Sequence, residues 1–158
     1  MSKEKIAFIP KQYFAVVAVL LAIMMSVLDG TIMNIALPTL AHDFDVTPAN
    51  AIWIINAYQL VITMTLLSFA SLGDIYGYRR IFLTGISIFV GASAACAFSD
   101  SFWMLTVSRI IQGFGAACVM SVNTALIRLI YPPQILGRGM GVNAMVVAVS
   151  AAAGPSIA

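Results

Sequence analysis

Residues 13–37 read YFAVVAVLLAIMMSVLDGTIMNIAL, and this stretch decides the fold class because its only charged residue is Asp29. A helix needs about 20 apolar residues to cross a hydrocarbon core about 30 Å thick. The stretch therefore predicts a transmembrane helix. The competing interpretation is a cleaved signal peptide, since lysines precede an apolar run, but the span is too long for one.

The same pattern continues along the whole chain of 158 residues. Hydrophobic residues make up 61% and charged residues 9%, and the mean hydropathy is +1.01, whereas soluble domains carry about 25% charged residues. Further spans are expected at residues 51–72, 81–98, 102–127 and 139–158. The connections are short, which predicts antiparallel neighbours. The predicted fold class is all-α transmembrane, with five membrane-spanning helices in one partial bundle over residues 1–158.

Turn and capping residues mark the expected ends of these spans. Thr47 and Pro48 suit an N-cap followed by a first-turn proline, and Ser99 with Asp100 offers a cap for the fourth helix. The run Tyr131-Pro132-Pro133 is expected to end that helix.

The basic residues fall on one side of the predicted bundle. Seven of the eight flank the spans on this side: Lys3, Lys5, Lys11, Arg79, Arg80, Arg128 and Arg138. The two connections on the other side carry Asp43, Asp45 and Asp100 without Lys or Arg. The positive-inside rule then places the N-terminus in the cytoplasm of a multi-pass protein of the inner (plasma) membrane. The net charge of +2 forms no basic face, so no nucleic-acid partner is expected.

Two ionisable residues lie inside spans, Asp29 in the first and Arg109 in the fourth. Each costs about 2.5 to 3.5 kcal/mol at mid-membrane and needs a partner or a water-filled cavity. Counting from Pro38 and Ser101 at about 1.5 Å per residue places both at the same depth, so a direct or water-bridged pair is possible. The pair could be purely structural, or it could be a protonation site; intramembrane ionisable residues favour the second interpretation.

Uncharged polar residues mark further faces. Asn56, Gln59 and Thr63 recur on one stripe of the second helix, expected either to line a cavity or to bond a neighbouring helix. Gln112 lies one turn after Arg109, where its amide could hold the guanidinium or meet a substrate, and Asn34 is a further cavity-lining candidate. The fifth helix carries a ridge of small residues, predicted as a packing surface: Gly137, Gly141, Ala144, Ala148 and Ala152.

No enzyme chemistry is indicated. The single histidine, His42, has no zinc-ligand spacing around it, so no metal is expected. Cys96 and Cys118 are interpreted as packing residues. There is no nucleophile with a histidine and an acid, and no phosphate-binding loop. The sequence therefore predicts neither an enzyme nor a bound cofactor.

Three motifs together resemble the major facilitator superfamily, specifically its fourteen-helix drug:proton antiporter subfamily. Residues 28–38, LDGTIMNIALP, resemble the first-helix signature. Residues 72–80, LGDIYGYRR, are similar to the loop between helices two and three, although Ile75 and Tyr78 occupy two usually basic positions and Ala70 replaces the usual leading glycine. Residues 109–117, RIIQGFGAA, resemble the fourth-helix motif, whose arginine is implicated in proton coupling.

A fourth motif resembles the fifth-helix antiporter signature through Gly141, Ser150, Gly154 and Pro155, with Ser150 at a position that is usually glycine. The resemblance implies that Gly73, Asp74, Gly77, Arg79 and Arg80 form a cytoplasmic gate. It also implies that Asp29, Arg109 and Gln112 serve proton coupling and transport.

The family resemblance implies proton-coupled efflux of small amphipathic or cationic compounds, with the proton as coupling ion. Five helices are fewer than the six of one half of this fold, so the chain is expected to be a fragment that needs a missing C-terminal half. The partners would then be the lipid bilayer, that missing half and a small-molecule substrate. The alternative is a truncated, non-transporting polypeptide or a helix-packing scaffold.

Overall fold

The computed structural model describes residues 10–157, and within them all regular structure is helical. The five long helices are α1 (Pro10–Asp43), α2 (Pro48–Tyr76), α3 (Tyr78–Ala97), α4 (Phe102–Ile130) and α5 (Leu136–Ile157), with a short 3-10 turn at Pro133–Ile135. All five are long and apolar enough to cross a membrane. The predicted fold class is therefore confirmed.

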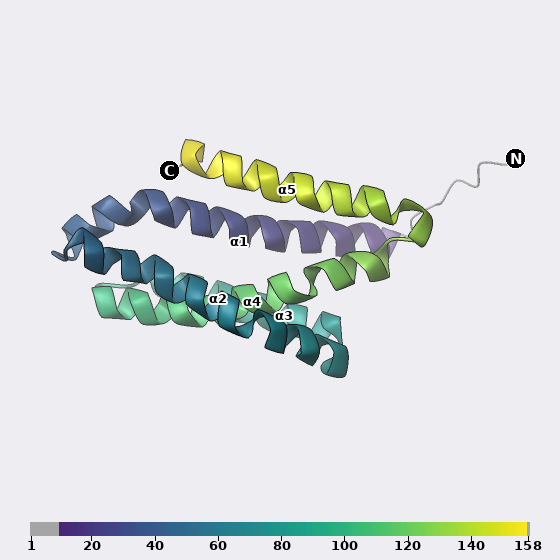
Figure 1. Ribbon diagram of the computed structural model, residues 1–158, viewed down its shortest axis with the longest axis horizontal. Coiled ribbons are helices and arrows are strands. Elements are labelled where there is room, and N and C mark those ends of the chain that lie inside the picture. The colour runs from purple at the N-terminus through teal and green to yellow at the C-terminus, as the bar shows by residue number, and fades with distance from the viewer. Residues whose placement is uncertain (1–9, 158) are drawn as a thin grey trace, which may run out of the picture.

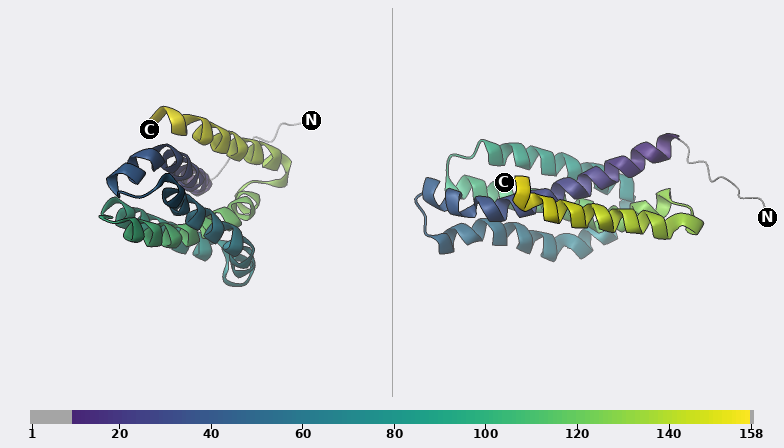
Figure 2. Two further views of the ribbon diagram at one scale, coloured as in Figure 1. Left: turned by 60° about the vertical axis from the view of Figure 1, so that its left-hand side comes forward. Right: turned by 90° about the horizontal axis from the view of Figure 1, so that it is seen from above.

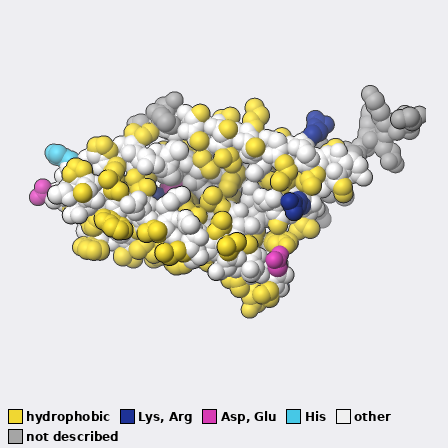
Figure 3. Space-filling view, in the orientation of Figure 1, with side chains coloured by type: hydrophobic (Ala, Val, Ile, Leu, Met, Phe, Trp, Pro, Cys, Tyr) yellow, Lys and Arg dark blue, Asp and Glu magenta, His cyan; other side chains and the backbone are white. Residues whose placement is uncertain are grey.

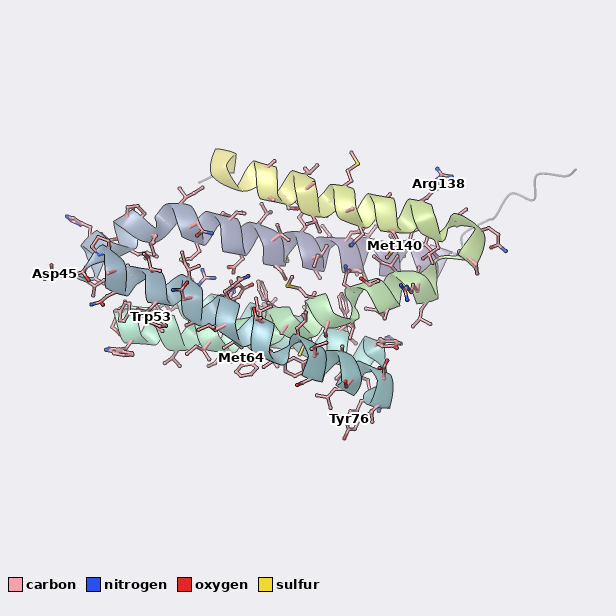
Figure 4. All side chains as sticks on the ribbon, viewed as in Figure 1. Asp45, Trp53, Met64, Tyr76, Arg138 and Met140 are labelled. Carbon is pink, nitrogen blue, oxygen red and sulfur yellow. The ribbon has the colours of Figure 1, made fainter. Side chains whose placement is uncertain are left out.

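Successive helices run in opposite directions (Figure 1). The α1–α2 and α3–α4 connections lie at one end of the bundle, called here the Asp45 end, and the α2–α3 and α4–α5 connections lie at the other, the Arg138 end (Figure 4). Basic side chains are visible only toward the Arg138 end on the face drawn in Figure 3, apart from one in the central recess, and the histidine lies at the opposite end. Lys3 and Lys5 lie outside the described residues, and side chains are described from Phe14 to Gly154.

Helix α4 is the centre of the bundle. Its most extensive contacts are with α3 and α2, whereas α1 packs mainly with α5 to form a second layer (Figures 1 and 2). The close α3–α4 contact requires glycine: a Cβ added at Gly115 would lie 2.6 Å from the backbone nitrogen of Phe89. Most of α4 is buried inside the protein, while the other helices keep mostly exposed faces. These faces suit contact with lipid chains.

Apart from the start of α4, every helix bound differs from the predicted spans, and two of the expected end signals act otherwise than the sequence indicates. α1 continues past Pro38 to Asp43, because a proline inside a membrane helix removes one hydrogen bond without ending the helix when neighbouring groups compensate. α4 is capped by Ser101, whose Oγ accepts a hydrogen bond from the Met104 N–H at 3.3 Å, and not by Ser99 or Asp100. Ser99 instead donates its hydroxyl to the Ala95 carbonyl at the end of α3.

The other two expected signals stand as the sequence indicates. The Thr47 side chain accepts from the Asn50 N–H, with Pro48 in the first turn of α2. α4 ends at Ile130, immediately before Tyr131-Pro132-Pro133.

Candidate functional site

A buried ion pair joins α1 to α4. Arg109 Nη1 donates to Asp29 Oδ2 at 2.6 Å, and the two side chains are 7% and 17% exposed. The structure thus shows a direct contact, one of the two arrangements that the equal depth allows. A charge-assisted hydrogen bond of this length, shielded from solvent, is among the stronger polar contacts in proteins.

Gln112 completes the coordination of the carboxylate. Its Nε2 donates to Asp29 Oδ1 at 3.0 Å, so each carboxylate oxygen has a donor from α4. The sequence left open whether the Gln112 amide holds the guanidinium or meets a substrate; in the structure it donates to the carboxylate that Arg109 also contacts, because the one-turn spacing places both side chains on the same face of α4. Asp29 therefore receives two parallel donors from one rigid helix.

Cys96 extends this network to α3. Its thiol donates to Gln112 Oε1 at 3.7 Å, within the range for a sulfur donor, and Gln112 is 1% exposed. Sequence reasoning treated Cys96 only as a packing residue. The short connection predicts that α3 and α4 lie side by side, but the residue of α4 that lies opposite Cys96 depends on the stagger of the two helices, which the sequence does not give.

Tyr58 of α2 lies beside the guanidinium. The Arg109 Cζ is 5.9 Å from the ring centroid, within the range of a cation–π contact, and Tyr58 is 6% exposed. The Nε of Arg109 is buried and has no partner among the described residues. The ring thus covers a cation that is only partly satisfied by hydrogen bonds, and the sequence carried no signal for this role.

A cavity of about 240 Å³ adjoins the pair between α1, α2 and α4. Asn34 and Gln59 line it, as does Arg109, although the Asn34 amide already donates to the Gly30 carbonyl at 2.8 Å. Asn56 and Thr63 do not reach this cavity. Together with Gln59, Trp53 and Leu60 they line a separate groove of about 300 Å³ on the exposed face of α2.

The residues expected at the gate lie at the α2–α3 connection. Gly77 adopts φ +93°, which a side chain would disfavour, and Gly73 is packed against Val122. Asp74 accepts a hydrogen bond from the Tyr78 hydroxyl, so a tyrosine at a usually basic position bonds the acid. Among the described residues, Arg79 and Arg80 are exposed and form no ion pair.

The four fifth-helix residues separate into two groups. Ser150 and Gly154 are buried against α1, and a Cβ at Gly154 would overlap Thr31. Gly141 is exposed, and the side chain of Pro155 lies outside the described ones. No helix of this chain covers the predicted packing ridge, because all five of its residues are exposed: Gly137, Gly141, Ala144, Ala148 and Ala152. The side chain of Asn143 instead connects α5 to α4, accepting from Asn123 at 3.1 Å.

Five membrane-length helices, with a buried ion pair between α1 and α4, define a multi-pass membrane bundle. The sequence profile of the Major Facilitator Superfamily matches residues 19–158, and the chain belongs to this family.

Curated relatives are transporters. The chain is 58% identical over 150 residues to the uncharacterized transporter YebQ of Escherichia coli, a match covering 95% of this chain and 33% of YebQ. It is 34% identical over 147 residues to the riboflavin transporter RibZ of Clostridioides difficile, covering 93% and 32%. It is 37% identical over 140 residues to the tetracenomycin C resistance and export protein of Streptomyces glaucescens, covering 89% and 26%. The chain thus spans about a third or less of the length of these relatives.

Proposed function

We propose that this chain is the N-terminal segment of a proton-coupled antiporter that exports small amphipathic or cationic compounds across the inner membrane. The observation that carries the proposal is the Asp29 carboxylate held between Arg109 and Gln112 beside a cavity. An acid placed inside a span is costly unless it is paired. Its ability to gain and lose a proton gives a reason for keeping it there.

In this mechanism Asp29 exchanges a proton with the outer side. Protonation removes the negative charge, so the attraction to Arg109 is lost while Gln112 can still donate to the carboxyl. The guanidinium, left with Tyr58 and the adjoining cavity, is then free to take another partner. A difference in pairing between the two states biases the equilibrium between outward-open and inward-open conformations.

In this proposal the Arg138 end of the bundle is the cytoplasmic end and carries the gate. The Arg138 end faces the cytoplasm together with the N-terminus, because the basic residues gather there. Gly73, Asp74, Gly77, Arg79 and Arg80 latch this end, and the exposed Arg79 and Arg80 remain available to a partner outside this chain. The proton is the coupling ion, and no other cofactor takes part.

The direction and the substrate class are supported by the relatives. One relative is named as an export protein and another as a riboflavin transporter. Both names concern small organic molecules, which is consistent with a small-molecule substrate here. The rest of a longer transporter supplies the second wall of the substrate path, since α2 exposes Asn56, Gln59 and Thr63 to a groove that this chain leaves open.

The test is an Asp29→Asn substitution in the complete transporter that contains this segment. Proton-driven efflux from membrane vesicles is expected to fall to background, while the amount of protein inserted in the membrane stays unchanged. Asp100→Asn, at an exposed acid of the α3–α4 connection, is the matched control and retains efflux. Efflux that persists in the Asp29 variant would remove the coupling role.

A second candidate is a helix-packing scaffold that does not transport. It is favoured by one observation, the exposure of the five small residues along α5, since small residues allow close helix approach in membranes. Ala148→Leu would then abolish self-association of this chain, measured by cross-linking in vesicles, and self-association that persists in this variant would remove the candidate.

A further inference from the structure

A second hollow lies at the Asp45 end, outside the ion-pair site. It is an open groove of about 390 Å³ between α2 and α4, lined by Asn50, Trp53, Ala57, Phe102, Trp103 and Thr106. Trp53, labelled in Figure 4, lies on α2 near this end. Its volume falls within the range of about 300 to 1,000 Å³ typical of small-molecule sites.

The lining combines aromatic rings with two polar groups. Phe102 and Trp103 meet edge to face with ring centroids 5.5 Å apart, and Trp53 forms the opposite wall from α2. Asn50 and Thr106 supply hydrogen-bonding groups, and the lining contains no charged residue. Such a surface selects flat aromatic molecules, which stack on rings and need only a few polar contacts for orientation.

The groove shares no lining residue with the cavity beside Arg109, but a third hollow on α2 shares one residue with each of them. Trp53 lines both this groove and the polar groove with Asn56 and Thr63. Gln59 lines both that polar groove and the cavity beside Arg109. Three hollows therefore follow one another around α2, from the buried ion pair to the aromatic residues.

We propose that the groove of Trp53, Phe102 and Trp103 is a binding subsite for planar aromatic molecules. We also propose that it is the outermost binding site on the transport route that includes the cavity beside Arg109. The proposal rests on the proposed function for its direction, and it narrows the substrate class to compounds with a flat aromatic system. Binding itself needs neither a proton gradient nor a charged Asp29.

The chain provides its own reporter. It contains two tryptophans, and both line the groove. Riboflavin, a flat aromatic molecule, is the probe, and tetraethylammonium, a non-aromatic cation, is the negative control. With this chain in phosphatidylcholine vesicles, riboflavin is expected to quench tryptophan fluorescence saturably, and tetraethylammonium is expected to leave it unchanged.

Two variants locate the binding. Ala57→Leu fills the groove and is expected to weaken the riboflavin midpoint at least tenfold, whereas Ala70→Leu, also half-buried on α2 but away from the groove, leaves it unchanged. Trp103→Ala removes a mostly exposed ring without disturbing the core, and the remaining Trp53 should report weaker binding by a similar factor.

Three results would overturn the subsite. Quenching that rises linearly and equally in all variants would mean partition into the bilayer. Quenching by brominated lipid that riboflavin does not relieve would mean that lipid chains occupy the groove. An unchanged midpoint in both Ala57→Leu and Trp103→Ala would place the binding elsewhere. Saturable binding that survives in Asp29→Asn, together with unaltered efflux in that variant, would leave the subsite standing while the coupling mechanism fails.

Discussion

Arg109 Nη1 lies 2.6 Å from Asp29 Oδ2 although 80 residues separate the two in the chain. This contact joins the α1–α5 layer to the α2–α3–α4 layer inside the bundle. It therefore has consequences for stability that can be measured separately from transport.

Removing one partner of the ion pair should lower the free energy of unfolding more than removing both partners. Arg109→Leu leaves a buried carboxylate with Gln112 alone, and breaking a buried ion pair in this way costs about 3–5 kcal/mol. The double variant Asp29→Asn with Arg109→Leu should recover most of this loss, because no charge remains to be paired. Thermal unfolding in detergent measures both. Equal destabilisation in the single and double variants would mean that the contact contributes little.

The Cys96 thiol is expected to hold the Gln112 amide in the orientation that serves Asp29. An amide has one acceptor oxygen and two N–H donors, so a donor at Oε1 directs the NH₂ group toward the carboxylate. Cys96→Ala should destabilise the protein by about 1 kcal/mol and shift the Gln112 side-chain amide signals in NMR, whereas Cys96→Ser retains a donor and restores them. Cys118→Ser is the control, and Gln112 signals that do not move in Cys96→Ala would contradict the role.

Close packing of α3 on α4 should tolerate no side chain at Gly115. A Cβ there would meet the α3 backbone, so Gly115→Val forces the helices apart and costs about 1–3 kcal/mol. Gly91→Val is the matched control, since nothing lies within 4 Å of a Cβ at that position. Comparable melting temperatures for the two variants would show that the α3–α4 contact is less tight.

The amide contact between α4 and α5 should be modest in energy. Interhelical side-chain hydrogen bonds in membranes contribute about 0.6 kcal/mol on average, so Asn143→Ala should destabilise by about that amount by depriving Asn123 of its partner. Asn56→Ala, on an exposed face of α2, should have no effect. A loss of several kcal/mol at Asn143 would indicate that α5 depends on this bond more than on its packing against α1.

The sequence predicts the features that depend on hydropathy and on the position of a residue along its helix. Five spans follow from hydropathy, and the pairing of Asp29 with Arg109 becomes possible once both are counted from the ends of their helices. Tyr58 and Cys96 were missed because their roles depend on which helix faces which, and that information lies in tertiary packing. The small residues of α5 show the same limit: a 3.6-residue period identifies a face but not the neighbour that covers it.

The 80-residue separation between Asp29 and Arg109 has a consequence for membrane insertion during synthesis. During synthesis α1 enters the membrane 80 residues ahead of Arg109, and at about 5–20 residues per second Asp29 waits about 4–16 s without its partner. α1 is also the most apolar of the five spans, which offsets the insertion cost of one acid. Helix α1 is therefore apolar enough to stay inserted in the bilayer before α4 is synthesised.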